Sequence, residues 1–255
     1  MTAKPLEGTV ALVTGSSSGI GAATARRLAA EGAAVALVAR RRERLEELAA
    51  AIRGEGGTAL VVEADITDQR LAVEAVDRAA SQLGRLDAVV NNAGIMLLGP
   101  ALSASLEEWD QMLALNLQGL LYVTHAALPH LVRAAESSPR RVADLVNVSS
   151  TAGRLARPGS SVYNLTKFGL NGFSDALRQE MLAHRVRVGI VEPGAVDTEL
   201  VSHVRADVQQ AARNQLESIE RLRSEDIADA VAYVITRDRR VAVNELLFRA
   251  AAQTW

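Results

Sequence analysis

Short apolar segments separated by helical stretches set the strongest limit on what this chain can fold into. Six of them consist mainly of Val, Leu, Ile and Ala, at residues 10–13, 35–38, 60–62, 88–90, 145–148 and 188–191. Because their apolar residues are consecutive and not alternate, they are typical of strands covered by helices on both faces. The alternation predicts repeated βαβ units, and hence an α/β protein with a doubly wound parallel sheet of the Rossmann type.

Helical spacing follows three of these segments, at residues 22–30, 42–53 and 68–83. Ser105 and Glu108 form the Ser-x-x-Glu pattern of a capping box, which predicts the start of a long helix. No repeat or low-complexity linker interrupts the 255 residues, so we predict a single domain over 1–255. Asp144 is unexpected beside an apolar segment, and we interpret it as a strand start or an edge position.

Charge and composition narrow the classes of partner. The formal net charge is -2 without a long basic run, whereas nucleic acids and anionic membranes require clustered Lys and Arg. No stretch approaches the roughly 18 apolar residues of a membrane span. The chain has no cysteine, and its four histidines lack metal-ligand spacing. These observations predict a soluble, cytoplasmic protein that binds no nucleic acid, membrane or metal.

A glycine-rich turn follows the first strand segment. Residues 14–21 read Thr-Gly-Ser-Ser-Ser-Gly-Ile-Gly and run directly into the first helical stretch. Glycines allow a tight turn and close approach to a pyrophosphate, whose charge is stabilised by the helix N-terminus. The spacing Gly-x-x-x-Gly-x-Gly differs from Gly-x-Gly-x-x-Gly, and a merely tight turn is the alternative. The strand before it and the helix after it favour a dinucleotide site.

The end of the second strand segment bears on which nicotinamide cofactor binds. An acidic residue there would accept hydrogen bonds from a ribose 2′-hydroxyl, but the sequence is Ala39, Arg40, Arg41. Guanidinium groups can bind a 2′-phosphate through charge-assisted hydrogen bonds, so NADP(H) is favoured over NAD(H). The alternative is that residues 40–44 are only the solvated start of a helix.

Tyr163 and Lys167 are four residues apart on a predicted helix and therefore share one face. A neighbouring ammonium is expected to lower the pKa of the phenol, which makes Tyr163 a candidate general acid and base. Ser150, at the end of a strand segment, could polarise a carbonyl oxygen by a hydrogen bond. Tyr-x-x-x-Lys alone is common and also fits a surface helix pair, so only the combination is informative.

Taken together, these motifs resemble the short-chain dehydrogenase/reductase family over nearly the whole chain. The matching residues, in the family's order and spacing, are 14–21, Asp65, 91–94, Asn116, Ser150, Tyr163, Lys167 and 193–194. Residues 95–100, 127–130, 192–194 and 198–200 resemble the branch that contains serine 3-dehydrogenase-like enzymes and clavulanic acid dehydrogenase. The resemblance implies an NADP(H)-dependent alcohol dehydrogenase or carbonyl reductase, with a substrate lid at about 195–223 and a homotetrameric or homodimeric assembly.

The resemblance also assigns roles to individual residues. Catalysis would use Asn116, Ser150, Tyr163 and Lys167, with Asn116 holding a water in a proton relay to Lys167. Motif chemistry and resemblance together predict a cofactor site of Gly15, Ser17, Ser18, Gly19, Ile20, Gly21, Arg40, Arg41, Asp65, Ile66, Asn92, Ala93, Gly94, Tyr163, Lys167, Pro193, Gly194, Val196 and Thr198.

The sequence departs from the family's pattern at two places, and two alternative functions stay open. Ser18 stands where many NADP-dependent members have a basic residue, and the C-terminal region lacks their Asp-Gly-Gly. A cofactor-sensing binding protein without catalysis is one alternative, although it would not need the Asn, Ser, Tyr and Lys set. An epimerase or dehydratase is the other, although those usually have a longer chain with an added substrate domain. The small-molecule substrate itself is not predicted.

Overall fold

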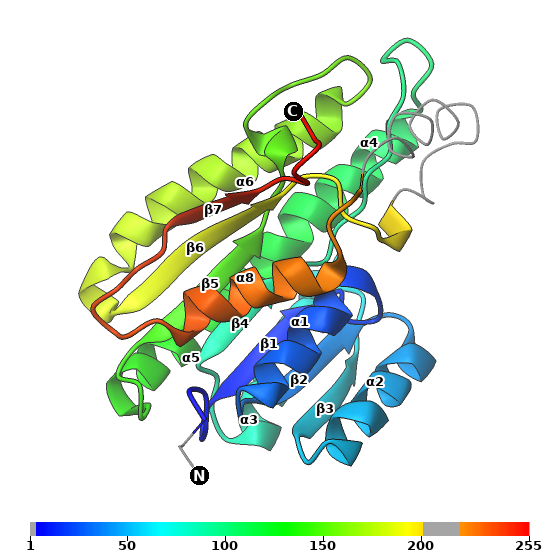
Figure 1. Cartoon of the computed structure of the whole chain (residues 1–255). Helices are drawn as coiled ribbons and strands as arrows, with labels where there is room; N and C mark the ends of the chain where they lie inside the picture. The colour runs from blue at the N-terminus through cyan, green and yellow to red at the C-terminus, as the bar shows by residue number, and fades with distance from the viewer. Residues whose placement is uncertain (1–3, 201–219, 255) are drawn as a thin grey trace.

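A single parallel sheet forms the centre of the molecule (Figure 1). The computed structural model describes residues 4–200 and 220–254. Its strand order is β3-β2-β1-β4-β5-β6-β7. The strands are β1 (Val10–Thr14), β2 (Ala34–Ala39), β3 (Thr58–Glu63), β4 (Ala88–Asn91), β5 (Ala143–Val148), β6 (Val186–Pro193) and β7 (Glu245–Phe248). The predicted doubly wound α/β domain is confirmed.

Helices cover both faces of this sheet. One face packs against α1 (Gly19–Ala30), α2 (Arg42–Gly54) and α8 (Ser224–Thr236), and the other against α3 (Gln69–Leu83), α5 (Leu120–Ser137) and α6 (Ser161–Glu180). Successive residues of β1 point to opposite faces of the sheet: Val13 packs in the hydrophobic core on the first face, and Leu12 packs in the core on the second. Both faces of the strands are therefore buried, as their consecutive apolar residues predict. Among the described helices, none has the length and apolarity that crossing a membrane requires.

The helix predicted at the capping box begins where expected. Ser105 Oγ accepts a hydrogen bond from Glu108 N at 3.2 Å, at the start of α4 (Leu106–Leu113). The helical chain then widens into a π-helical segment, η1 (Ala114–Gly119), before it continues as α5. Such π-helical insertions are frequent at functional sites, and this one carries Asn116.

Sequence analysis did not predict the seventh strand, β7, which pairs in parallel with β6. β7 lies at the edge of the sheet, and two of its four residues, Glu245 and Leu247, are exposed. The pairing continues past the strand, where Gly194 N donates to Phe248 O at 2.7 Å. The C-terminal tail is thereby directed toward the carboxyl end of β6.

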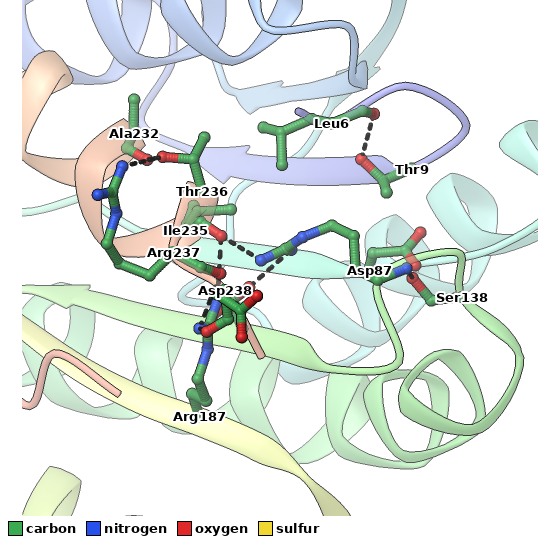
Figure 2. Close-up of polar contacts among 12 residues, drawn as sticks. Leu6, Thr9, Asp87, Ser138, Arg187, Ala232, Ile235, Thr236, Arg237 and Asp238 are labelled. Atoms are coloured by element: carbon green, nitrogen blue, oxygen red, sulfur yellow. Dashed lines mark hydrogen bonds and ion pairs between the residues drawn. The ribbon is translucent and has the colours of Figure 1, made fainter. Parts of the chain in front are cut away.

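Asp144 is the second residue of β5 and so lies close to a strand start, as expected, but the interpretation as an edge position is wrong. β5 lies between β4 and β6, and Asp144 is almost fully buried there. Its carboxylate accepts from Arg140 Nη1 at 2.8 Å and from Arg187 Nε at 2.8 Å. Figure 2 shows Arg187 reaching the C-terminal end of α8, where its guanidinium also donates to Ile235 O at 3.0 Å. A buried charge cluster therefore fastens α8 to the middle of the sheet.

Candidate active site

A cavity of about 600 Å³ lies at the carboxyl ends of the strands. Segments that follow β1 to β6 contribute to its wall, which is where parallel α/β sheets bind ligands. All the cofactor and catalytic residues named from the sequence line this cavity except Gly21 and Asn116. Of the predicted lid at 195–223, residues 201–219 lie outside the described residues.

The glycine-rich turn forms one end of the cavity. Gly15 has a φ of +66°, and a Cβ there would lie 2.8 Å from Ala93 Cα, so a side chain would be both strained and obstructed. Thr14 Oγ1 joins the neighbouring loop by accepting from Asn92 N at 3.0 Å and Ala93 N at 3.1 Å. Gly21 lies against the carbonyl of Gly15 and leaves no room for a Cβ. The role of Gly21 is thus to let α1 approach the turn and not to line the cavity.

The N-terminus of α1 faces this end of the cavity. Gly19 and Ile20 begin the helix and both line the cavity. Their position presents the positive end of the helix dipole to any anion bound there. Close backbone packing, the positive φ of Gly15 and the N-terminus of α1 together suit this end of the cavity to bind the pyrophosphate of a dinucleotide.

Two arginines after β2 border the same end but are held differently. Arg41 donates to Ser17 Oγ from Nε at 3.1 Å and to Ser18 Oγ from Nη2 at 2.7 Å. Arg40 is mostly exposed and lies 3.7 Å from the carboxylate of Asp65, which also accepts from Thr67 Oγ1 at 2.8 Å. Arg41 is therefore fixed against the turn, whereas Arg40 is restrained by one long ion pair.

Tyr163 and Lys167 lie at the other end of the cavity, on the buried face of α6. Lys167 Nζ is 5.8 Å from the centre of the Tyr163 ring and donates to Val148 O at 3.0 Å. Ser150, just after β5, donates to Pro193 O at 3.3 Å and accepts from Ala152 N at 3.1 Å. The segment after β5 and the helix that follows it, α6, thus bring a phenol, an ammonium and a hydroxyl to one end of the cavity.

The expected lowering of the Tyr163 pKa by Lys167 is wrong. Burial raises the pKa of the phenol to about 12, and a hydrogen bond with Ser150 offsets only part of that rise. Burial also lowers the pKa of Lys167 to about 8. The four-residue spacing places both groups on one face, but desolvation exceeds any attraction between them. Tyr163 is consequently protonated at neutral pH.

Comparison with known proteins now identifies the family. The sequence model described as short chain dehydrogenase matches residues 9–209. The chain belongs to the short-chain dehydrogenase family.

Several relatives extend this comparison within the family of oxidoreductases. Sulfoacetaldehyde reductase 2 of Chromohalobacter salexigens is 36% identical over 250 residues, which cover 96% of each chain. A serine dehydrogenase structure complexed with NADP+ has a TM-score of 0.88 at 31% identity and covers 97% of both chains. A 3-ketoacyl-(acyl-carrier-protein) reductase from Brucella melitensis complexed with NADH has a TM-score of 0.83 at 30% identity, covering 96% of this chain and 98% of that one.

In this short-chain dehydrogenase, the side chain of Asn116 is occupied by protein contacts. Its Oδ1 accepts from Ile95 N at 2.8 Å, and its Nδ2 donates to Ile95 O at 2.8 Å and to Thr166 Oγ1 at 3.3 Å. The amide therefore fixes the loop after β4 against α6. A water relay at Asn116 stays a prediction.

A buried carboxylate beside the active site was missed in the sequence. Glu192 is fully buried near the end of β6, where its carboxylate accepts from Arg154 Nε at 2.8 Å and Asn171 Nδ2 at 2.7 Å. Asn171 Oδ1 in turn accepts from Ser149 Oγ at 2.6 Å. This network fixes the residue before Ser150 to α6 and β6. Its members are far apart in sequence and form no motif.

The C-terminal tail supplies another residue that no motif indicated. Gln253 lines the cavity, and its Oε1 accepts from Ala195 N at 2.9 Å. A Cβ on Gly194 would meet the amide end of this side chain, which would then have to move from its present position. Gln253 thus supports the segment after β6 that was predicted to border the nicotinamide.

Among the described residues, no group of three or more His, Cys, Asp or Glu side chains has an arrangement that could hold a metal ion.

Proposed function

We propose that this oxidoreductase uses NADP(H) to interconvert an alcohol with an aldehyde or ketone, with Tyr163 as general acid and base. The observation that carries the proposal is the convergence of Tyr163, Lys167 and Ser150 at one end of a cavity whose other end is the glycine-rich turn. A dinucleotide that spans the cavity would place its reactive ring beside the phenol. Binding alone does not require that arrangement.

The residues of the chain suit distinct parts of the reaction. A nicotinamide cofactor would supply or accept the hydride, held by the turn at Gly15, the N-terminus of α1 and the 193–198 segment. Ser150 would donate a hydrogen bond to the carbonyl oxygen of the substrate. Tyr163 would deliver its proton to that same oxygen, and the nearby charge of Lys167 would stabilise the phenolate that is left.

The pH dependence of carbonyl reduction tests this division of roles. Reduction needs protonated Tyr163 and charged Lys167, and the lower pKa of the two is that of Lys167, at about 8. We therefore expect kcat/KM for reduction to be constant near neutral pH and to fall as the pH rises above about 8. A pH profile of kcat/KM measures this directly.

Lys167→Arg is the matched variant for that profile, because guanidinium does not lose its proton in this range. Any activity that it retains should lack the alkaline fall. A wild-type profile that stays flat well above pH 8, or an identical fall in the arginine variant, would remove Lys167 from the mechanism.

Preference for NADPH is proposed from the two arginines after β2. Arg41→Ala is expected to weaken the binding of NADPH about tenfold to hundredfold, because charge-assisted hydrogen bonds to a 2′-phosphate would be lost. The affinity for NADH should change little. Arg40→Ala should act in the same direction. Dissociation constants from NAD(P)H fluorescence measure both effects.

Arg42→Ala is the control, because Arg42 does not line the cavity and instead pairs with Glu46 and Glu63. Equal losses for NADPH and NADH in the Arg40 and Arg41 variants would refute their assignment to the 2′-phosphate.

The substrate end of the cavity guides the choice of compounds. Met96, Leu98 and Leu155 give it apolar walls, and Arg157 also lines it, without a side-chain hydrogen bond or ion pair to the described residues. We propose testing neutral aldehydes and ketones beside carbonyl compounds that carry an acidic group, 3-oxo acids among them. NADPH oxidation with this panel tests the proposed activity, and its absence with every compound would contradict the proposal.

A dimer or tetramer is also proposed. Exposed apolar side chains lie on α5 and α6, among them Leu121, Leu165 and Phe168. Leu165 and Phe168 are three residues apart and share one face of α6, and a patch of exposed apolar side chains is typical of protein interfaces. Measuring the mass in solution tests the assembly.

A further inference from the structure

The carboxylate of Glu199 joins two arginines at the cofactor end of the cavity. Its Oε2 accepts from Arg41 Nη1 at 2.9 Å, and its Oε1 accepts from Arg44 Nη1 at 2.5 Å. Glu199 and Arg41 line the cavity together with Ser17 and Ser18, whereas Arg44 does not. The carboxylate thus lies beside the guanidinium that the proposed function assigns to a 2′-phosphate.

Hydrogen bonds to protein groups already occupy much of Arg41. Its Nε and Nη2 donate to the two serine hydroxyls of the glycine-rich turn, and its Nη1 donates to Glu199. A guanidinium has five N–H groups in a fixed plane, so a phosphate could gain a bidentate contact only by displacing one of these partners. The serines are neutral and belong to the turn, which leaves the carboxylate as the competing anion.

The state of charge supports this competition. The two guanidinium groups hold the pKa of Glu199 at about 2, with the hydrogen bond from Arg44 as the largest cause. Glu199 is therefore an anion at every pH at which the enzyme would work. A phosphate dianion placed nearby would be repelled by the Glu199 carboxylate, which already accepts hydrogen bonds from both arginines.

We propose that Glu199 is a specificity-determining residue of the cofactor site, whose carboxylate, held in place by Arg44, competes with a ribose 2′-phosphate for Arg41. The inference rests on the proposed function, because it requires a nicotinamide dinucleotide with its adenosine ribose beside Arg41. NADPH has to displace the carboxylate, whereas NADH, with a neutral 2′-hydroxyl, does not. Glu199 thus restricts the preference for NADPH that the arginines alone would give.

Glu199→Gln tests the proposal, because it removes the charge and keeps the shape. Two partly exposed ion pairs are lost, so we expect NADPH to bind about tenfold more tightly and NADH to change by less than about twofold. Adenosine 2′,5′-bisphosphate should tighten like NADPH, and 5′-AMP should behave like NADH. Titration calorimetry with all four ligands gives the dissociation constants without turnover.

Asp197→Asn is the matched control on the same segment. Asp197 lies outside the cavity and pairs with Arg221 at 2.9 Å, so this variant removes one negative charge without freeing Arg41. We expect its affinities to equal those of the wild type. In an Arg41→Ala background, the gain from Glu199→Gln should become small, since the shared partner is gone.

The outcomes separate this inference from the proposed function. Unchanged or weaker NADPH binding in Glu199→Gln would overturn the inference, as would an equal gain for NADPH and NADH or an equal gain in Asp197→Asn. If the wild-type protein binds neither cofactor, the proposed function itself fails.

Discussion

Replacing Tyr163 by phenylalanine is expected to lower the turnover of carbonyl reduction by about 10²- to 10⁴-fold, the usual contribution of a positioned proton donor. Tyr163 is a buried residue of α6, and the variant removes only its hydroxyl. Because the ring stays in place, the shape of the cavity should be kept. NADPH affinity should therefore remain within about twofold of the wild type.

Single-turnover kinetics and NADPH fluorescence measure the two quantities separately. Tyr233→Phe is the matched control, because Tyr233 is half exposed on α8 and does not line the cavity. We expect no change in either quantity for that variant. Retained turnover in Tyr163→Phe would remove the proposed general acid, and a large loss of NADPH binding would show that the phenol serves the cofactor instead.

Replacing Asp144 by asparagine is expected to lower the free energy of unfolding by about 3–5 kcal/mol, as typically follows when one partner of a buried ion pair is removed. Asp144 is the shared anion of Arg140 and Arg187, and both arginines are nearly buried. Asparagine keeps the volume but leaves two guanidinium groups without a countercharge in the middle of the sheet. Their other hydrogen bonds, to backbone carbonyls at the end of α8, do not neutralise them.

Urea unfolding followed by circular dichroism measures the loss. Asp175→Asn is the control, because its pair with Arg178 lies at the surface of α6 and should contribute only about 0–1 kcal/mol. If the two variants lose equal stability, the cluster at Asp144 does not fasten α8 as the contacts indicate.

Local patterns explain which parts of the structure were predictable from the sequence. Six strands were identified because helices cover both faces of the sheet, so that the apolar residues of these strands are consecutive in the sequence. The glycine-rich turn was equally readable, since positive φ at Gly15 and the contact of Gly21 with the turn require glycine. β7 was not identified: its apolar run is only Leu246 to Phe248, and two of the four residues of the strand are exposed.

Other features depend on contacts between distant residues and leave no pattern. Asp144 meets Arg187 from a neighbouring strand, so its polarity suggested an edge until the partner was known. Spacing placed Lys167 beside Tyr163 but could not show that both groups are buried, and burial decides the direction of both pKa changes. Likewise, Glu199 meets Arg41 across 158 residues of chain.

The contact between Gln253 and the backbone of Ala195 has a practical consequence for handling the protein. Gln253 lies at the cavity, whereas Lys4 lies against Gly32, just before the start of β2. A purification tag fused after Trp255 is expected to disturb this contact, and with it the segment that was predicted to border the nicotinamide. The affinity tag therefore belongs at the N-terminus.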